Sequence, residues 1–149
     1  MKDQNRIPQL VRQLNSFNNL KIRIGIMAPG GDKIYMIARV HEYGIDIPVT
    51  DKMRGWFLSQ GMPLRKDTDR IRIPERSYLR TGYDKNESAF ERKAQELINQ
   101  VLQGTMSAYD AREKLGNYIV EKIQDNVVEV DLIDTEKLKD SIGFRVVKR

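Results

Sequence analysis

The chain has 149 residues and carries 26 Lys and Arg against 21 Asp and Glu, a net charge of +5. This length suits one domain with a core of its own, and 40% hydrophobic with 32% charged residues is typical of globular proteins. The lack of cysteine excludes disulfides, thiolate metal sites and cysteine nucleophiles, and the single histidine, His41, excludes any site that needs two histidines.

The charge is spread unevenly along the chain. Residues 1–80 hold 15 basic and 8 acidic side chains, whereas residues 81–149 hold 11 and 13. This asymmetry favours attraction to an anionic surface or between unlike faces of neighbouring copies, and an ordinary solvated surface is the alternative. No apolar stretch approaches the ~20 residues of a membrane span, and the first six residues lack the apolar core of a signal peptide. We therefore expect a cytoplasmic protein without membrane contact.

The first 44 residues predict a helix, a strand and a second helix. Residues 1–20 are expected to form an N-terminal helix, and residues 21–26 alternate as in a half-buried strand. The apolar face of that helix comprises Ile7, Leu10, Val11, Leu14 and Phe17. Residues 33–43 fit both periods, but Asp32 as N-cap and Gly44 as C-terminal stop favour a helix.

A hairpin is expected over residues 45–76. Its strands, 45–49 and 70–74, both alternate and are natural antiparallel partners. Between them lies an inserted loop, 50–69, in which Thr50 or Asp51 can cap a short helix. The amphipathic positions of this short helix are Met53, Trp56 and Phe57.

Residues 84–125 predict a helical pair. Ser77 can cap the first helical stretch, Gly82 marks an interruption in it, and Gly104 ends it. Ser107 with Asp110 resembles a capping box for the second helix. The apolar face of the first helix comprises Phe90, Ala94, Leu97, Ile98 and Val101, and that of the second Ala108, Ala111, Leu115, Ile119 and Ile123.

The C-terminal part is expected to be mostly extended. Residues 127–132 predict an extended segment, and residues 134–149 a short helix followed by a strand. Asp134 or Thr135 caps that helix, which runs through Leu138 and Ile142. Helices and strands interleave without a parallel-sheet rhythm. The sequence therefore predicts a single α+β domain over 1–149, with a small, mostly antiparallel sheet and a long hairpin packed against two to three amphipathic helices.

No residue pattern points to catalysis. Adjacent residues such as His41 and Glu42 do not face each other on a helix, and position 45 lacks the second histidine of a zinc motif. The segment 29–33 lacks the spacing of a phosphate loop, and the acidic residues of 110–140 lack that of a calcium loop. We expect no enzyme, catalytic residue, metal site or cofactor.

A basic ridge, residues 65–80, is the most prominent charge feature. Its six cations are Arg65, Lys66, Arg70, Arg72, Arg76 and Arg80, against Asp67, Asp69 and Glu75. Arg70 and Arg72 alternate with isoleucines and should reach solvent together. Such a ridge can contact phosphates or an acidic protein, and a plain solvated face is the third interpretation.

Three motifs follow one another along the chain. They are ARVHEYG at 38–44, IRIPERSYLR at 71–80 and DTEKLKDSI at 134–142. Together they resemble the tail-component proteins of tailed bacteriophages and prophages, whose pattern reads roughly His-Glu-(Tyr/Phe)-Gly, then Ile-Pro-x-Arg-x-(Phe/Tyr)-(Leu/Ile)-Arg, then Asp-Thr-Gly-x-Leu-x-Asp-Ser-Ile. The chain departs from it at Ser77, at Glu136 and in the long insert 50–69.

The resemblance implies a structural role without catalysis. Such proteins act at the head–tail junction as neck or tail-completion subunits, commonly in a ring of six. The partners implied are connector or head-completion proteins and tail-terminator or tail-tube proteins. The protein would occur in the host cytoplasm during assembly and in the virion when mature.

The insert 50–69 is the expected docking surface, because an aromatic hairpin tip suits contact with a neighbour. The residues expected to bind partners are Trp56, Phe57, Leu58, Arg65, Lys66, Arg70 and Arg72. In the other interpretation, Trp56 and Phe57 simply cover the core. The alternative function is a basic nucleic-acid-binding module that acts through the ridge, with non-specific DNA contact.

Overall fold

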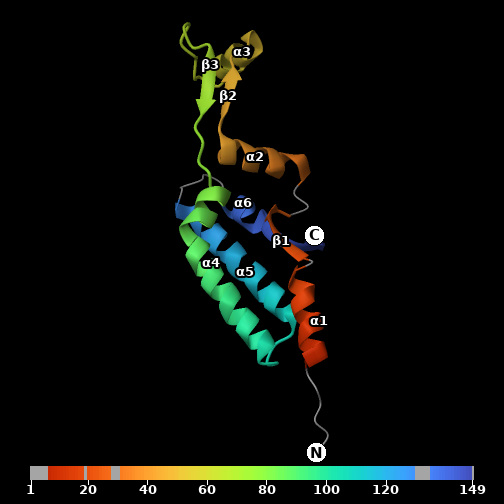
Figure 1. Cartoon of the computed structure of the whole chain (residues 1–149). Helices are drawn as coiled ribbons and strands as arrows, with labels where there is room; N and C mark the ends of the chain where they lie inside the picture. Colours follow the sequence, from red (N-terminus) through yellow and green to blue (C-terminus); the bar gives the residue numbers. More distant parts are fainter. Residues whose placement is uncertain (1–6, 19, 28–30, 130–134, 149) are drawn as a thin grey trace, which may run out of the picture.

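The computed structural model describes residues 7–18, 20–27, 31–129 and 135–148. These residues form a helical body and an arm that projects from one end of it (Figure 1). The elements are α1 (Ile7–Asn18), β1 (Leu20–Ile26), α2 (Gly31–Tyr43), β2 (Ile45–Pro48), α3 (Asp51–Ser59), β3 (Arg70–Ile73), α4 (Leu79–Leu102), α5 (Ala108–Glu129), α6 (Thr135–Ser141) and β4 (Ile142–Lys148).

The body is built on α4 and α5, which lie side by side (Figure 1). A short connection joins them, with Gly104 at φ +76° after α4 and a reciprocal pair between Ser107 and Asp110 before α5. Their apolar faces form one buried cluster near the connection: Leu97, Val101, Ala108 and Ala111. A second buried cluster adds α2, α6 and β4: Ala38, Tyr78, Phe90, Ile119, Ile123, Val127, Leu138 and Ile142.

Strands β1 and β4 pair antiparallel and cover α5. Ile24 and Ile26 pack against the second cluster, because alternate residues of a strand point to the same face. Phe144 of β4 lies so close to Gly116 that a Cβ there would come within 2.4 Å of its ring. Only glycine leaves room for β4 to approach α5 this closely.

The arm consists of β2, α3 and β3. The two strands pair antiparallel, with Ile45 opposite Ile73 and Ile47 opposite Ile71. They form a two-stranded sheet separate from the β1–β4 pair. The arm and α2 lie at one end of the body, and α1 lies at the other (Figure 1).

The α+β fold and the antiparallel hairpin are confirmed. The β-structure of the described residues is divided between two sheets instead of one. Residues 33–43 are helical, but the helix begins at Gly31, so Asp32 lies in its first turn and not at the N-cap. The N-terminal helix is present, with Ile7, Val11 and Leu14 exposed.

Three expectations about the second half are wrong. Helix α4 runs through Gly82 without interruption. Helix α5 continues to Glu129, so Val127 is buried on a helix and not in an extended segment. Helix α6 ends at Ser141, and Ile142 begins β4. Asp134 and residues 130–132 lie outside the described residues.

Candidate docking surface: the arm and its clamp

The tip of the arm exposes large apolar side chains. Trp56 is 56% exposed and Leu58 65% exposed, and Met62 is exposed beside them. Phe57 is half-buried and packs edge-on against Trp56, with 4.9 Å between the ring centroids. No residue of α3 is buried. The tip therefore presents an apolar surface that the described part of its own chain leaves uncovered.

Polar contacts, and not a core, hold the tip in shape. The Thr50 hydroxyl caps α3 by accepting from the Met53 amide at 3.3 Å. The Arg54 guanidinium spans the inserted loop: its Nη1 donates to the Arg65 carbonyl at 2.9 Å. Its Nη2 donates to carbonyls further along the loop. These bonds tie α3 to the segment that leads into β3.

The base of the arm requires glycine at one position. Gly44 has φ +66°, a conformation that side chains rarely adopt, and it joins α2 to β2. A Cβ there would lie 2.8 Å from the Glu75 amide nitrogen and 3.0 Å from the Ile73 carbonyl. Across the base, the Arg76 amide donates to the His41 carbonyl at 2.8 Å. The two strands therefore leave the body at closely packed backbone.

A buried carboxylate, Glu42, joins this base to the body. It is 4% exposed at the end of α2 and accepts amide hydrogen bonds from Tyr78 and Leu79, both at 2.9 Å. It also accepts from the Arg80 amide at 3.2 Å. The first amides of a helix have no partner within the helix, and the negative charge matches the positive end of the helix dipole. Glu42 thus caps α4 from another helix.

The side chains of Ser77 and Arg80 also bind Glu42, and we call Glu42 with these partners and the amides of residues 78–80 the Glu42 clamp. The Ser77 hydroxyl donates to Glu42 Oε1 at 2.7 Å, and Arg80 Nε donates to the same oxygen at 3.1 Å. Arg80 also pairs with Glu75 at 2.5 Å. Burial raises the pKa of Glu42, but the hydrogen bonds from Leu79, Ser77 and Arg80 outweigh it, and the net pKa is lowered. The carboxylate is therefore charged at neutral pH.

The Glu42 clamp corrects the expected role of Ser77. Ser77 does not cap α4: the N-cap residue is Tyr78, which makes no side-chain cap bond, and the Ser77 hydroxyl is given to Glu42. Sequence reasoning missed the role of Glu42, because its partners lie more than thirty residues away and no local pattern marks them.

A second buried polar residue, Asn126 of α5, forms hydrogen bonds with the same end of α4. Asn126 Nδ2 donates to the Tyr78 carbonyl at 2.8 Å and to the Thr81 hydroxyl at 2.9 Å. Its Oδ1 accepts from Lys85 Nζ at 3.1 Å. Glu42 and Asn126 therefore fix the start of α4, which follows β3 of the arm along the chain.

His41 stands beside the clamp but forms no site with Glu42. Burial and the neighbouring Arg76 charge lower the pKa of His41, so its imidazole is neutral at pH 7. Its Nδ1 has no hydrogen-bond partner among the described residues. Nowhere in 7–18, 20–27, 31–129 and 135–148 do three His, Asp or Glu gather as metal ligands.

All seven residues expected to bind partners lie on the arm. Arg70 and Arg72 reach solvent together as expected, and Arg65 and Lys66 are exposed on the inserted loop. Arg72 forms a long ion pair with Asp46, at 3.8 Å. Since Arg80 is engaged by two glutamates, the ridge has fewer free cations than its composition indicates.

The described part of the body has several hollows, among them a groove and an apolar pocket. A groove of about 940 Å³ runs between α2, the end of β1 and the start of α4, with Tyr35, Met36 and Tyr43 exposed around it. Tyr78 lines this groove, and its buried hydroxyl has no partner among the described residues. Burial, with the nearby Glu42 charge, raises the pKa of Tyr78.

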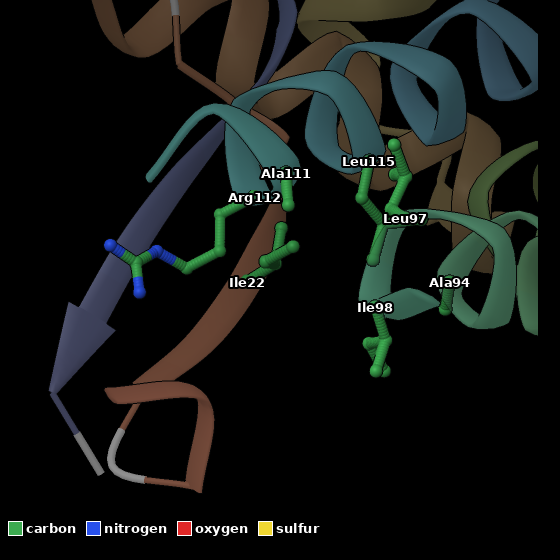
Figure 2. A pocket seen from close by; sticks show the side chains of 7 residues that line it. All are labelled: Ile22, Ala94, Leu97, Ile98, Ala111, Arg112 and Leu115. Carbon is green, nitrogen blue, oxygen red and sulfur yellow. The ribbon is translucent and has the colours of Figure 1, made fainter. Parts of the chain in front are cut away.

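Another hollow is a pocket of about 180 Å³ between β1, α4 and α5 (Figure 2). Its lining is apolar apart from Arg112, and Ile22, Leu97 and Leu115 are among the apolar side chains (Figure 2). The guanidinium of Arg112 points away from Leu97 and Leu115 (Figure 2). The mostly apolar lining suits an apolar group.

None of the described helices is long and apolar enough to cross a bilayer. Comparison with known proteins finds no matching family model, no matching curated protein and no matching solved structure.

Proposed function

We propose that this chain is a structural assembly protein of a tailed bacteriophage or prophage, a neck or tail-completion subunit that joins the head connector to the tail. The three motifs that resemble tail-component proteins support the family. The observation that carries the mechanism is the arm, whose tip exposes Trp56, Leu58 and Met62 on a frame of polar contacts. Exposed apolar clusters on a fixed frame are typical of interaction surfaces.

The motif residues support this role by placing the arm. Gly44 of the first motif forms the turn into β2, and Glu42 beside it clamps the start of α4, which the second motif supplies. Leu138 of the third motif is buried in the core that α2 also joins. The first two motifs therefore join the arm to the body, and the third contributes to the core against which α2 packs.

Two unlike surfaces with exposed apolar side chains support self-association as part of this proposal. The arm tip is convex and the groove beneath α2 is concave, and both expose aromatic side chains. A contact between the arm of one copy and the groove of the next is heterologous, and such contacts close into rings when the rotation fits. An arm-to-groove contact of this kind would be the proposed ring contact, and six copies is the number that the resemblance implies.

The alternative function, nucleic-acid binding through the ridge, stays a prediction. Arg65, Lys66 and Arg70 are exposed for such a contact, whereas Arg72 and Arg80 form ion pairs. Measuring the DNA affinity of variants tests this ridge together with the basic face of the β1–β4 sheet.

The proposal is tested by light scattering coupled to size-exclusion chromatography. The chain is measured alone and with connector and tail-tube proteins of the phage or prophage that encodes it. We expect an oligomer or a complex that the double variant Trp56→Ser, Leu58→Ser abolishes. The matched control is Tyr109→Ser with Val128→Ser, because Tyr109 is 63% exposed on α5 and Val128 is exposed on the same helix. A chain that stays monomeric and binds neither protein contradicts the proposal, as does equal loss in both variants.

A further inference from the structure

The outer face of the β1–β4 sheet is basic. The two strands contain Lys21, Arg23, Arg145 and Lys148 and no acidic residue. Ile22, Ile24 and Ile26 face the body, so Lys21 and Arg23 point the other way, where they are exposed. Arg145 is also exposed, and the register places it directly opposite Arg23. Three cations therefore share one open face.

This arrangement opposes folding. Side chains directly opposite each other on antiparallel strands have Cβ atoms about 5 Å apart, and like charges there repel. In the part of the chain that the structure describes, none of Lys21, Arg23 and Arg145 has an ion-pair partner. A Cβ built on Gly25, on the same face, meets nothing within 4 Å. The face is therefore open and its charge is not neutralised.

The chemistry of this face suits phosphates better than a protein. Protein interfaces have an apolar core and few lysines, whereas nucleic-acid interfaces are polar and strongly basic. The aromatic ring of β4, Phe144, packs on α5 at Gly116, so no ring on these strands faces outward to stack on a base. Guanidinium groups bind phosphate oxygens in a planar fork. The geometry favours a phosphate backbone and not exposed bases.

We propose that the outer face of the β1–β4 sheet binds the phosphate backbone of duplex DNA through Lys21, Arg23 and Arg145. Binding neutralises the opposed arginines and releases counterions, and it is independent of base sequence. This site is separate from the ridge on the arm, and it does not depend on the proposed function.

The test is fluorescence anisotropy with a short labelled DNA duplex of arbitrary sequence, titrated at several salt concentrations. Three phosphate contacts predict a plot of log affinity against log salt with a slope of about −2.7. The variant Arg23→Gln, Arg145→Gln retains one contact, and its expected slope is about −0.9. We also expect its affinity to fall about tenfold or more at low salt. The charge-matched control, Arg92→Gln with Lys137→Gln on exposed sites elsewhere, keeps the steep slope.

A second variant and a second readout separate binding from folding. Arg145→Glu places a carboxylate opposite Arg23, so it should fold at least as stably as the natural chain while losing DNA binding. Thermal unfolding of Arg23→Gln, Arg145→Gln should likewise show no loss of stability, because a repulsion is removed. The proposal is overturned if the natural chain does not bind at low salt or if the control pair loses as much affinity. It is also overturned if only Arg65→Gln with Lys66→Gln on the ridge abolishes binding.

Discussion

The arm and the body are stabilised in different ways. The body buries two apolar clusters between its helices and the β1–β4 sheet. In the arm, no residue of α3 is fully buried, and the shape depends on the Thr50 cap, the Arg54 bonds and the backbone contact at Gly44. Apolar surface stabilises a protein only when it is removed from water. The body buries its apolar residues, whereas the arm leaves Trp56 and Leu58 exposed, where we propose that a partner binds.

Truncating one aromatic residue in each region should give the largest contrast. Phe90 is buried in the body and contacts the rings of Tyr83 and Tyr118. Phe90→Ala should lower the free energy of unfolding by about 3–5 kcal/mol, because it leaves a cavity. Trp56→Ala, on the exposed tip, should change it by less than about 1 kcal/mol. Urea unfolding measures both, and equal losses would mean that the tip is part of the folding core.

Removing the clamp should have the next largest effect. Glu42→Ala leaves the first amides of α4 and the Ser77 hydroxyl without their acceptor, and we expect a loss of about 3 kcal/mol. Glu42→Gln keeps one acceptor oxygen and should lose roughly half as much. Glu75→Gln is the control, because Glu75 pairs with Arg80 at the surface, where ion pairs contribute about 0–1 kcal/mol. A Glu42→Ala protein as stable as the control would show that the Glu42 clamp does not stabilise the fold.

Gly44→Ala should loosen the arm more than the body. The positive φ and the approach to the Glu75 amide together predict strain of about 1–3 kcal/mol. We expect faster hydrogen exchange in β2 and β3 while α4 and α5 keep their protection. Gly25→Ala is the matched control, since a Cβ there meets nothing within 4 Å. Faster exchange throughout α5 in Gly44→Ala would show that the arm and the body unfold together.

The smallest effect is expected from pH. The pKa of His41 lies below 6.5 in the folded chain, so below pH 6.5 the unfolded chain binds a proton that the folded chain does not. Stability should therefore begin to fall as the pH drops below 6.5. Thermal unfolding of His41→Gln should show no decline in that range, and a decline that persists in this variant would assign it to another group.

Glu42 affects the stability of the fold at lower pH than His41 does. Its folded pKa lies below 4.5, so the stability that it contributes is present above pH 4.5 and is lost as the pH falls through the folded pKa. Glu42→Gln should be less stable at neutral pH and should lose less on acidification below 4.5. A variant with the same acid profile as the natural chain would contradict the lowered pKa.

Local patterns predicted the elements whose signals lie within one segment. The Ser107–Asp110 pair, the Thr50 cap and the pairing of 45–49 with 70–74 follow from neighbouring residues. The extended prediction failed at 127–129 because β-branched valines favour strands, whereas burial places Val127 on the helical face of Ile119 and Ile123. Tertiary burial outweighs propensity there.

The arrangement of these elements depends on contacts between distant residues. The chain pairs β1 with β4, and Glu42 reaches the amides at 78–80, so neither contact has a local pattern. The candidate docking residues could be named from sequence because exposed aromatics in a polar insert are unusual. The Glu42 clamp that fixes the arm could not be named.

The central claim is that copies and partners associate through the arm, and mixing two defective variants tests it most directly. One variant carries Trp56→Ser and Leu58→Ser on the arm, and the other carries Met36→Ser and Tyr43→Ser at the groove. We expect each to be monomeric alone by light scattering, and the mixture to form a one-to-one complex through its one intact arm–groove contact. A mixture that stays monomeric while the natural chain assembles would contradict arm-in-groove association.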